Sequence, residues 1–297
     1  MNTVHYTSCP VCDSRDINPL LTVKDHSVSK QDFVIWQCTN CSLRFTQDVP
    51  DSDSIGEYYR SPEYISHTNI ATGPVNRLYQ KVRKHTLSQK ASLITRFTVT
   101  AGAILDIGAG TGAFLHTMKE KNWKVTGIEP DAGAREEAKK SFEVELQDIH
   151  HLEKLSAGSF DAITMWHVLE HVHDLHATVE KLKSLLKPDG KMFIAVPNYT
   201  SGDSSIYKLF WAAYDVPRHL YHFTPKTMKV LLERHNLSII EKKPMWFDAF
   251  YISLLSSKYR KGRTSWIGAT ISGLRSNITA MVNRDRCSSV IYIAGKN

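Results

Sequence analysis

One stretch decides the fold of this 297-residue chain: Ile104-Leu105-Asp106-Ile107-Gly108-Ala109-Gly110-Thr111-Gly112-Ala113-Phe114-Leu115. An apolar run ends in a carboxylate, and three glycines alternate with small residues before a second apolar run begins. This order predicts a buried strand, a tight glycine turn and the start of a helix, where backbone N–H groups can approach a ligand closely. The spacing Gly108-x-Gly110-x-x-Ala113 also satisfies the dinucleotide-binding fingerprint, so the glycines alone do not identify the ligand.

Strand and helix patterns alternate from residue 103 onward, which predicts an α/β fold with a parallel sheet and right-handed crossovers. The expected strands are 104–107, 124–128, 143–146, 160–166, 191–196, 237–243 and 290–294. We expect three regions along the chain. They are a small module over 1–50, a helical connector over 51–100 with a helix at 75–97, and a main domain over 101–297 with insertions at about 198–223 and 245–286.

Asp106 stands two residues before the first glycine, and with it the stretch resembles motif I of the class I S-adenosylmethionine (SAM) methyltransferases, acidic-x-Gly-x-Gly-x-Gly. Nicotinamide-binding folds usually carry an apolar residue at that place. The resemblance, to bacterial families of type 23 and type 12, covers 103–196 with specific motifs and extends loosely to Thr224. It implies a Rossmann-like seven-stranded sheet, SAM as the cofactor, and a helix before motif I that packs over the cofactor.

Acidic residues after the strands are the candidate cofactor ligands. Glu129 ends the second strand, and a carboxylate there can accept hydrogen bonds from both ribose hydroxyls in nicotinamide and SAM folds alike. By resemblance, Asp106 faces the cationic amino-acid end of SAM and Asp148 accepts the adenine amine, with a solvated loop aspartate as the lesser alternative for Asp148. The glycines that let the chain pass beneath the ligand are Gly108, Gly110 and Gly112.

The fourth strand is followed by His167-Val168-Leu169-Glu170-His171-Val172, which matches the inverted zincin motif H-x-x-E-H literally. We reject that interpretation, because the histidines begin at the end of a buried strand and no third ligand is apparent. The phrase instead resembles the Leu-Glu-His-Val run that lines the active-site mouth of small-molecule and quinone-type methyltransferases. His171 is therefore a candidate general base, or a packed, hydrogen-bonded histidine.

The insertion after the fifth strand contains Arg218-His219-Leu220-Tyr221-His222-Phe223. It resembles the Arg-His-…-His-Phe segment of the type 23 family. Imidazole titrates near neutrality, so His219 or His222 could take a proton from the acceptor. A structural role stays open for each.

Four of the five cysteines form two pairs, Cys9-x-x-Cys12 and Cys38-x-x-Cys41. This spacing predicts a tetrahedral zinc site, and four thiolates leave the metal no open position, so its role should be structural. A module of fifty residues is too small to bury a core unaided, and a metal is the usual remedy. A thioredoxin-like redox pair or a chance spacing are the alternatives.

The net charge of +7 lies in one segment, because from Ala249 onward eight basic residues face the single acid Asp285. This favours an anionic substrate or an acidic surface as partner. Two amphipathic helices over 247–286 could form a lid, lie on a membrane surface, or simply pack against the fold. The absence of a long apolar run and of signal-peptide features predicts a cytoplasmic protein.

These patterns predict a SAM-dependent methyltransferase acting on a small-molecule acceptor. A four-cysteine module before a class I domain resembles the sugar C-methyltransferases, so an anionic, nucleotide-linked sugar is the first candidate. A lipid or quinone precursor is the second. RNA is the third, and nucleic acid is disfavoured because the module lacks basic and aromatic interleaving. From other classes, a NAD-dependent oxidoreductase and a non-catalytic cofactor-binding partner protein remain as alternatives.

Overall fold

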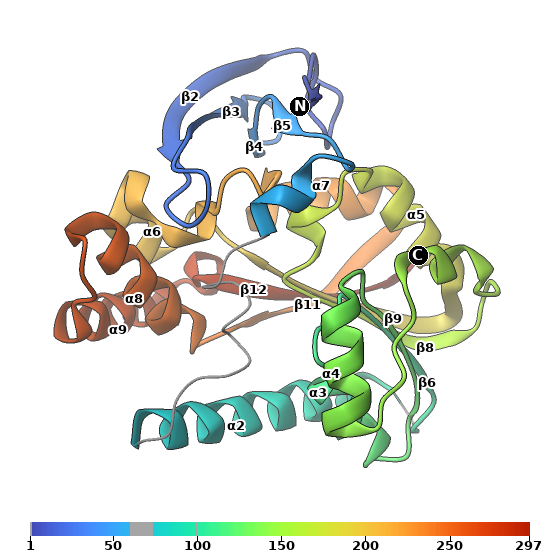
Figure 1. The fold of residues 1–297 in the computed structure, drawn as a ribbon. Helices are drawn as coiled ribbons and strands as arrows, with labels where there is room; N and C mark the ends of the chain where they lie inside the picture. The colour runs from blue at the N-terminus through green and yellow to red at the C-terminus, as the bar shows by residue number, and fades with distance from the viewer. Residues whose placement is uncertain (1, 60–73, 99) are drawn as a thin grey trace.

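A mixed six-stranded sheet forms the centre of the computed structural model, which describes residues 2–59, 74–98 and 100–297 (Figure 1). The strand order is β11-β12-β9-β8-β6-β7. Strands β7, β6, β8 and β9 run parallel, whereas β12 is antiparallel to both β9 and β11. The strands are β6 (Ala103–Ile107), β7 (Lys124–Ile128), β8 (Phe160–Trp166), β9 (Leu186–Pro197), β11 (Leu237–Pro244) and β12 (Ser289–Lys296).

Helices cover both faces of this sheet, which explains why β6 is apolar at consecutive positions. Ile104 packs with the face that carries α2, α3 and α4, and its neighbour Leu105 packs with the face that carries α5 and α7. Figure 1 shows these two helix layers on opposite sides of the sheet. The helices are α2 (Pro74–Phe97), α3 (Ala113–Lys119), α4 (Ala132–Phe142), α5 (Leu175–Leu185) and α7 (Pro225–Arg234).

The Rossmann-like α/β fold is confirmed, with one strand reduced. The expected strand at 143–146 is only a parallel bridge between Ile128 and Gln147. Glu143 ends α4 in the left-handed conformation, with φ at 52°, so little chain is left to extend before η3 (Ile149–Lys154) begins. The connector helix at 75–97 is confirmed as α2, and residues 60–73 of the connector lie outside the described residues.

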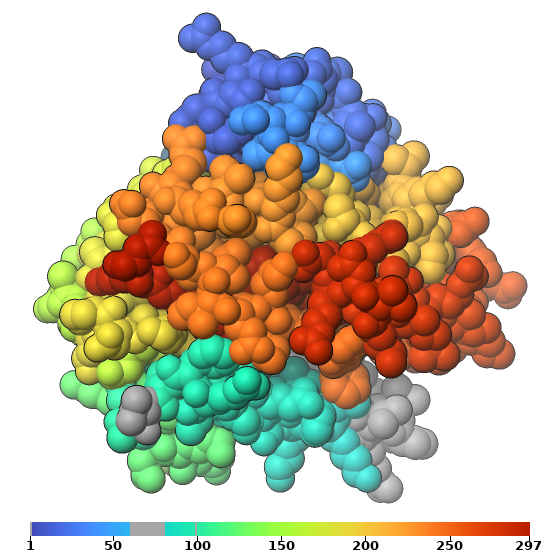
Figure 2. Space-filling model, turned by 180° about the vertical axis from the view of Figure 1, so that it is seen from behind, coloured from blue at the N-terminus to red at the C-terminus, as the bar shows by residue number. Residues whose placement is uncertain are grey.

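The N-terminal module contains β1 (Thr3–Val4), β2 (Ile17–Lys24), β3 (Asp32–Cys38), β4 (Arg44–Thr46) and β5 (Val49–Pro50). Its larger sheet has the order β10-β4-β3-β2, and β10 (Tyr221–His222) comes from the insertion after β9. The apolar core of the module is continuous with the core of the main domain, since Leu43 and Phe45 share a cluster with Leu105. Figure 2 shows the module as a cap over one end of the molecule.

The two insertions lie side by side at one edge of the molecule (Figures 1 and 2). The first contains α6 (Gly202–Tyr207), η5 (Lys208–Phe210), η6 (Ala212–Tyr214) and β10, and the second contains α8 (Asp248–Lys261) and α9 (Trp266–Val282). Helix α9 packs on α8 and α6 through small residues. Within the part of the chain that the structure describes, every helix is too short or too polar to cross a membrane.

Candidate active site

The glycine turn follows β6 and is held against the end of β7. The N–H groups of Gly108 and Ala109 both donate to the carbonyl oxygen of Ile128, at 2.8 and 3.0 Å. Gly108 has φ at +68°, and a Cβ there would lie 2.5 Å from a methyl carbon of Val168. Gly110 also has positive φ, but a Cβ there would meet open space. The turn therefore requires glycine at position 108 because Val168 packs against it, and it leaves room for a ligand at Gly110.

Asp106 lies at the carboxyl end of β6 and is only 2% exposed. Its Oδ1 accepts a hydrogen bond from the Thr164 hydroxyl at 2.5 Å. Burial raises the pKa of Asp106 to about 7, although Thr164 and the nearby Lys90 act in the opposite direction. A carboxyl group held in this way favours a cationic partner, because a positive ligand would compensate the lost hydration.

Glu129 and Asp148 lie along the neighbouring edge. The Glu129 carboxylate accepts hydrogen bonds from the N–H of Gly110 at 2.8 Å and of Asp131 at 3.0 Å, so it touches the glycine turn directly. Asp148 is exposed after the short bridge of Gln147, and its Oδ1 accepts from the N–H of His150 to cap η3. The structure thus brings Asp106, the glycines and Glu129 together and places Asp148 one strand further along the edge.

Helix α2 lies against this site from outside the sheet. The Lys90 ammonium lies 4.2 Å from the centre of the Trp166 ring, and Arg83 donates to the Thr111 hydroxyl at 3.3 Å. Burial lowers the pKa of Lys90. The indole N–H of Trp166 is buried and has no hydrogen-bond partner among the described residues. The site therefore contains a buried donor that no described residue satisfies.

A second polar cluster lies one turn after β8. Glu170 and His171 belong to η4 (Leu169–His171), and they meet His219 from the insertion. One ligand-type atom from each of the three side chains lies within 4.8 Å of the others. Glu170 and His219 are buried and His171 is half-buried, so the cluster is reachable from one side. Val168, which contacts Gly108, joins this cluster to the glycine turn.

The charge states in this cluster are set by its surroundings. Burial and the neighbouring His219 lower the pKa of His171 to about 4, so it is neutral at pH 7. His167 hydrogen-bonds Asp248 at 3.0 Å and lies 3.4 Å from Glu170; although burial opposes its charge, these two acids raise its pKa to about 9. His167 is therefore a cation tied to α8, and it does not share the environment of His171.

His222 lies apart from the cluster formed by Glu170, His171 and His219. It sits in β10 against β4, where its Nε2 donates to the Thr46 hydroxyl at 3.2 Å. The Thr46 hydroxyl donates in turn to the carbonyl oxygen of His219 at 2.8 Å. Burial lowers the pKa of His222 far below its usual range, which favours a neutral, packed histidine joining the insertion to the module.

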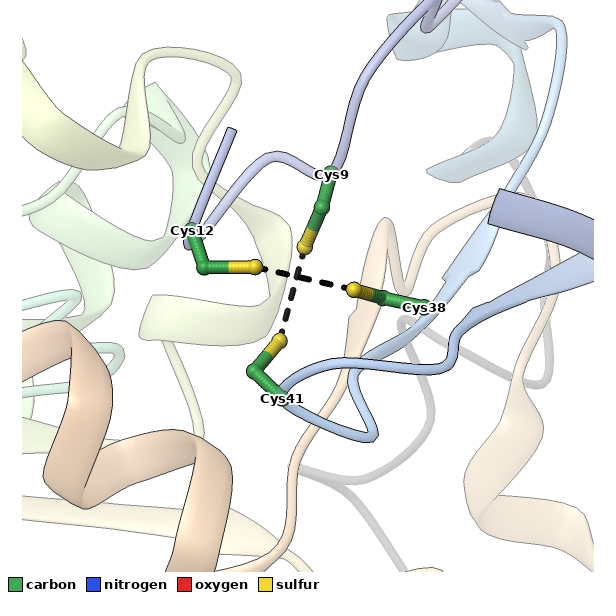
Figure 3. A group of neighbouring side chains, drawn as sticks. All are labelled: Cys9, Cys12, Cys38 and Cys41. Carbon is green, nitrogen blue, oxygen red and sulfur yellow. Dashed lines mark hydrogen bonds between the residues drawn. The ribbon is translucent and has the colours of Figure 1, made fainter. Parts of the chain in front are cut away.

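The four paired cysteines converge on one point, as Figure 3 shows. The Sγ atoms of Cys9 and Cys41 lie 3.5 Å apart, and those of Cys12 and Cys38 lie 3.6 Å apart. A tetrahedral zinc ion with Zn–S bonds of about 2.3 Å requires sulfur separations of about 3.8 Å, so the set fits this ion. Each cysteine pair lies in a turn closed by a backbone hydrogen bond. The N–H of Asp13 donates to the carbonyl oxygen of Cys9, and the N–H of Ser42 donates to the carbonyl oxygen of Cys38, both at 3.0 Å.

Residues 79–242, more than half of the chain, match a family model described as a methyltransferase domain. The chain belongs to this methyltransferase family. As such it is a SAM-dependent enzyme of the class I fold, and the residues of its glycine turn fit that cofactor. Asp106 is a buried carboxyl group, the indole N–H of Trp166 has no partner among the described residues, and a Cβ at Gly110 would meet open space.

Curated relatives match only part of the methyltransferase. The ubiquinone biosynthesis O-methyltransferase of Xanthomonas axonopodis pv. citri is 38% identical over 108 residues, which is 34% of this chain and 45% of the relative. The enzyme of the same name from Nitrosococcus oceani is 38% identical over 104 residues, or 33% and 44% of the two chains. The chain thus spans less than half the length of the curated relatives it matches.

Solved structures share the fold of the methyltransferase at low identity. Magnesium protoporphyrin IX methyltransferase from Synechocystis, with bound S-adenosylhomocysteine, has a TM-score of 0.54 and 14% identity, and the match covers 83% of this chain and all of that one. The 1,6-didemethyltoxoflavin-N1-methyltransferase of Burkholderia thailandensis has a TM-score of 0.51 and 13% identity, with 93% and 100% coverage.

Arg218 opens the Arg-His-…-His-Phe segment, and no role for it was predicted from the sequence. Its guanidinium is 1% exposed and pairs with both oxygens of Asp215, at 2.7 and 3.0 Å. It also reaches Asp25 at 3.2 Å and the Tyr58 carbonyl at 2.9 Å, so it joins the module, the connector and the insertion. The carbonyl oxygen of Arg218 accepts from Nδ1 of His171 at 2.9 Å. Arg218 is thus a positioning residue for His171.

Proposed function

We propose that this methyltransferase transfers the methyl group of SAM to a hydroxyl oxygen of a small amphiphilic acceptor of the quinone-precursor class, bound beside Glu170, His171 and His219. The observation that carries the proposal is the contact between Gly108 and Val168. It brings the cofactor turn and the polar cluster of η4 to the same mouth at the carboxyl ends of β6 and β8, where open α/β sheets bind ligands.

The roles of the cofactor residues follow from their placement. Asp106 would accept hydrogen bonds from the amino group of SAM, and charge-assisted bonds of this kind are the strong ones. Glu129 would accept from the ribose hydroxyls, exchanging the N–H of Gly110 for the ligand. Asp148 would accept from the adenine amine. The glycines would let the backbone approach the ligand, and α2 would exclude water from the methyl group.

His171 and His219 would meet the acceptor oxygen, since both lie next to the cofactor mouth and His171 is neutral at pH 7. His222, which lies in β10 and packs against β4, would support the insertion instead of taking a proton. The region over 51–100 would cover the cofactor through α2, and the region over 101–297 would carry the chemistry.

The outer face of α9 supports an amphiphilic acceptor. Its small residues Ala269, Gly273, Ser276 and Ala280 are buried, and its large apolar residues point outward. Between 52% and 78% of each of these side chains is exposed: Ile267, Ile271, Leu274, Ile278 and Met281. Basic residues end α8 and follow it, namely Lys258, Arg260, Lys261 and Arg263. An apolar stripe bordered by cations suits the surface of an anionic membrane, where such acceptors dissolve.

Cys9, Cys12, Cys38 and Cys41 would hold a structural zinc ion in the module. None of the five cysteines forms a disulfide, which supports a reducing compartment such as the cytoplasm. A peripheral site on the inner membrane face would agree with both features.

Calorimetric titration with S-adenosylhomocysteine, with NADH in parallel, tests the cofactor. We expect micromolar binding of the former and none of the latter, whereas tight NADH binding would favour an oxidoreductase. The acceptor is tested by product formation with a long-chain alkyl catechol in anionic vesicles. Methylation of the catechol oxygen is expected, and its absence with an active cofactor site would refute this acceptor class.

A nucleotide-linked sugar is the second candidate acceptor. An open cavity of about 320 Å³ beside α6 and α9 is lined by Arg275, Arg286 and Ser205. Two guanidinium groups at one cavity suit a diphosphate. Under this function, a nucleoside diphosphate sugar would be methylated and the vesicle-borne catechol would not.

A further inference from the structure

We propose that Glu170, His171 and His219 form a second metal site, separate from the four cysteines, which takes a divalent cation such as Zn²⁺ or Mn²⁺. One carboxylate and two imidazoles are a common ligand set for such ions. The inference deepens the proposed function and rests on it only for the role of the ion, because cation binding itself depends on these three side chains alone.

The distances within the cluster fit a closed ligand set after small side-chain movements. The three ligand-type atoms lie within 4.8 Å of one another. Metal–ligand bonds of about 2.1 Å in tetrahedral geometry would bring them to about 3.4 Å. The ring centres of His171 and His219 are 4.6 Å apart with planes at 79°, so the rings meet edge to face and are not stacked.

Hydrogen bonds orient both imidazoles for coordination. Nδ1 of His171 lies 2.9 Å from both the Arg218 carbonyl oxygen and the Tyr59 hydroxyl, and Nδ1 of His219 lies 2.8 Å from the Ala213 carbonyl oxygen. A carbonyl can only accept, so Nδ1 of each ring carries the proton and Nε2 of each neutral ring has a lone pair. Donation from the far ring nitrogen to a carbonyl is the usual outer support of a metal-bound histidine.

Glu170 supplies the second, independent observation. The side chain is fully buried, and its Oε2 has no hydrogen-bond partner among the described residues. Its Oε1 lies 3.4 Å from Nδ1 of His167, whose Nε2 pairs with Asp248, so Glu170 shares the His167 cation with Asp248. His167 therefore leaves Oε2 without a donor, and a buried carboxylate oxygen of this kind is costly unless a further partner fills the space.

The Asp215 carboxylate lies near His219 but is not a ligand of the proposed cation. Its Oδ2 is 4.0 Å from Nε2 of His219, and both of its oxygens are engaged by Arg218. The H-x-x-E-H phrase therefore does not work as an inverted zincin motif, since His167 binds Asp248. The third ligand is His219, which belongs to the insertion and lies 48 positions after His171 in the sequence.

Three protein ligands leave an open position, unlike the four-cysteine site. A hydroxyl bound there loses its proton more readily, because the cation stabilises the oxyanion. The oxygen–carbon bond then forms as the carbon–sulfur bond of SAM breaks, S-adenosylhomocysteine leaves, and the acceptor proton passes to solvent water. Glu170, His171 and His219 hold the ion throughout.

Mn²⁺ binding followed by electron paramagnetic resonance tests the site, because Mn²⁺ prefers oxygen and nitrogen ligands over thiolates. We expect the chain with zinc in the four-cysteine site alone to bind one Mn²⁺, and Glu170→Gln to weaken this binding at least about a hundredfold, since even outer partners of a metal contribute 10- to 100-fold. The matched control is Glu180→Gln, because Glu180 also pairs with a histidine, His235, at 3.0 Å. It should bind Mn²⁺ as the parent chain does.

Metal analysis and S-adenosylhomocysteine titration separate the outcomes. If Glu170→Gln does not fold, the zinc content of the parent chain decides: two ions per chain support the site and one refutes it. Mn²⁺ binding that persists in both Glu170→Gln and His219→Gln would also refute it. Cation binding without S-adenosylhomocysteine binding would support the site and overturn the proposed function, and the reverse result would overturn only the site.

Discussion

The N-terminal module and the main sheet are stabilised in different ways. In the main sheet, strands such as β9 and β12 are buried along most of their length, so apolar contacts on both faces stabilise them. In the module, β2 is mostly exposed, and the buried residues include Cys9, Cys38 and Cys41 themselves. Where apolar area is scarce, a metal site and polar contacts to the rest of the chain take over the stabilising role.

Cys38→Ser should have the largest effect and should be confined to the module. A structural zinc ion contributes on the order of 10 kcal/mol of folding free energy, which one missing thiolate largely removes. We expect loss of zinc by metal analysis and loss of amide protection over 2–50 in hydrogen exchange, with β6, β8 and β9 still protected. Cys287→Ser is the control, because Cys287 is buried outside the cysteine cluster. Equal loss of amide protection in the module and in the main sheet would contradict the conclusion that zinc stabilises only the module.

Arg218→Ala should destabilise the contact between the two regions by about 3–5 kcal/mol, the usual cost of leaving buried partner charges uncompensated. Asp25 and Asp215 would lose their counter-charge, and His171 would lose its anchored carbonyl. Urea unfolding measures the loss. Arg234→Ala is the matched control, since Arg234 also bridges to the module, at Asp13, but at the surface. It should change stability by at most about 1 kcal/mol.

Gly108→Ala should cost about 2–3 kcal/mol, because it adds left-handed backbone strain and a clash with Val168. Gly110→Ala adds similar backbone strain but meets open space, so its cost should be about 1–2 kcal/mol. The two thermal unfolding curves of the ligand-free protein, taken together, isolate the contact that joins the glycine turn to η4. Equal losses would mean that Val168 moves aside.

The affinity for S-adenosylhomocysteine should rise with pH. The pKa of Asp106 in the free protein is about 7, and only its ionised form pairs with the amino group of the ligand. The carboxyl is mostly protonated at pH 6 and mostly ionised at pH 8. Binding should therefore strengthen about tenfold over this range, equivalent to about 1.4 kcal/mol. Calorimetry at both pH values measures it, and Asp106→Asn should bind weakly and lose the dependence.

The smallest effect on stability is expected at the outer face of α9. Ile271→Glu should leave the unfolding free energy within about 0.5 kcal/mol, because the side chain is exposed. It should nevertheless reduce co-sedimentation with anionic vesicles. Thr270→Glu adds the same charge at the adjacent exposed position and should reduce it less. Equal reduction by both would indicate a purely electrostatic contact.

Local patterns explain how much could be predicted from sequence. The glycine turn, the cysteine pairs and Glu129 were recognisable because each signal lies within a few residues of one strand or turn. The strand expected at 143–146 was too strong a prediction, since Glu143 still belongs to the end of α4. Its remnant is the single bridge at Gln147.

Long-range contacts explain the rest. The contacts of Arg218 with Asp25 and Tyr58, and that of Lys90 with Trp166, could not be predicted, because these partners come from elements far away along the chain. His219 and His222 look alike in sequence, three residues apart, yet only His219 meets Glu170 and His171. The pairing of β10 with β4 decides this difference, and a two-residue strand leaves no periodic signal.

The completion of the module sheet by β10 has a consequence for protein engineering. Residues 2–50 cannot be exchanged with those of a relative as a self-contained cassette, because the fourth strand of their larger sheet and their buried arginine partner come from 215–223. A chimaera that replaces both segments together would keep the backbone ladder and the ion pairs intact. One that replaces only the first would leave β4 with an unmatched edge beside the active site.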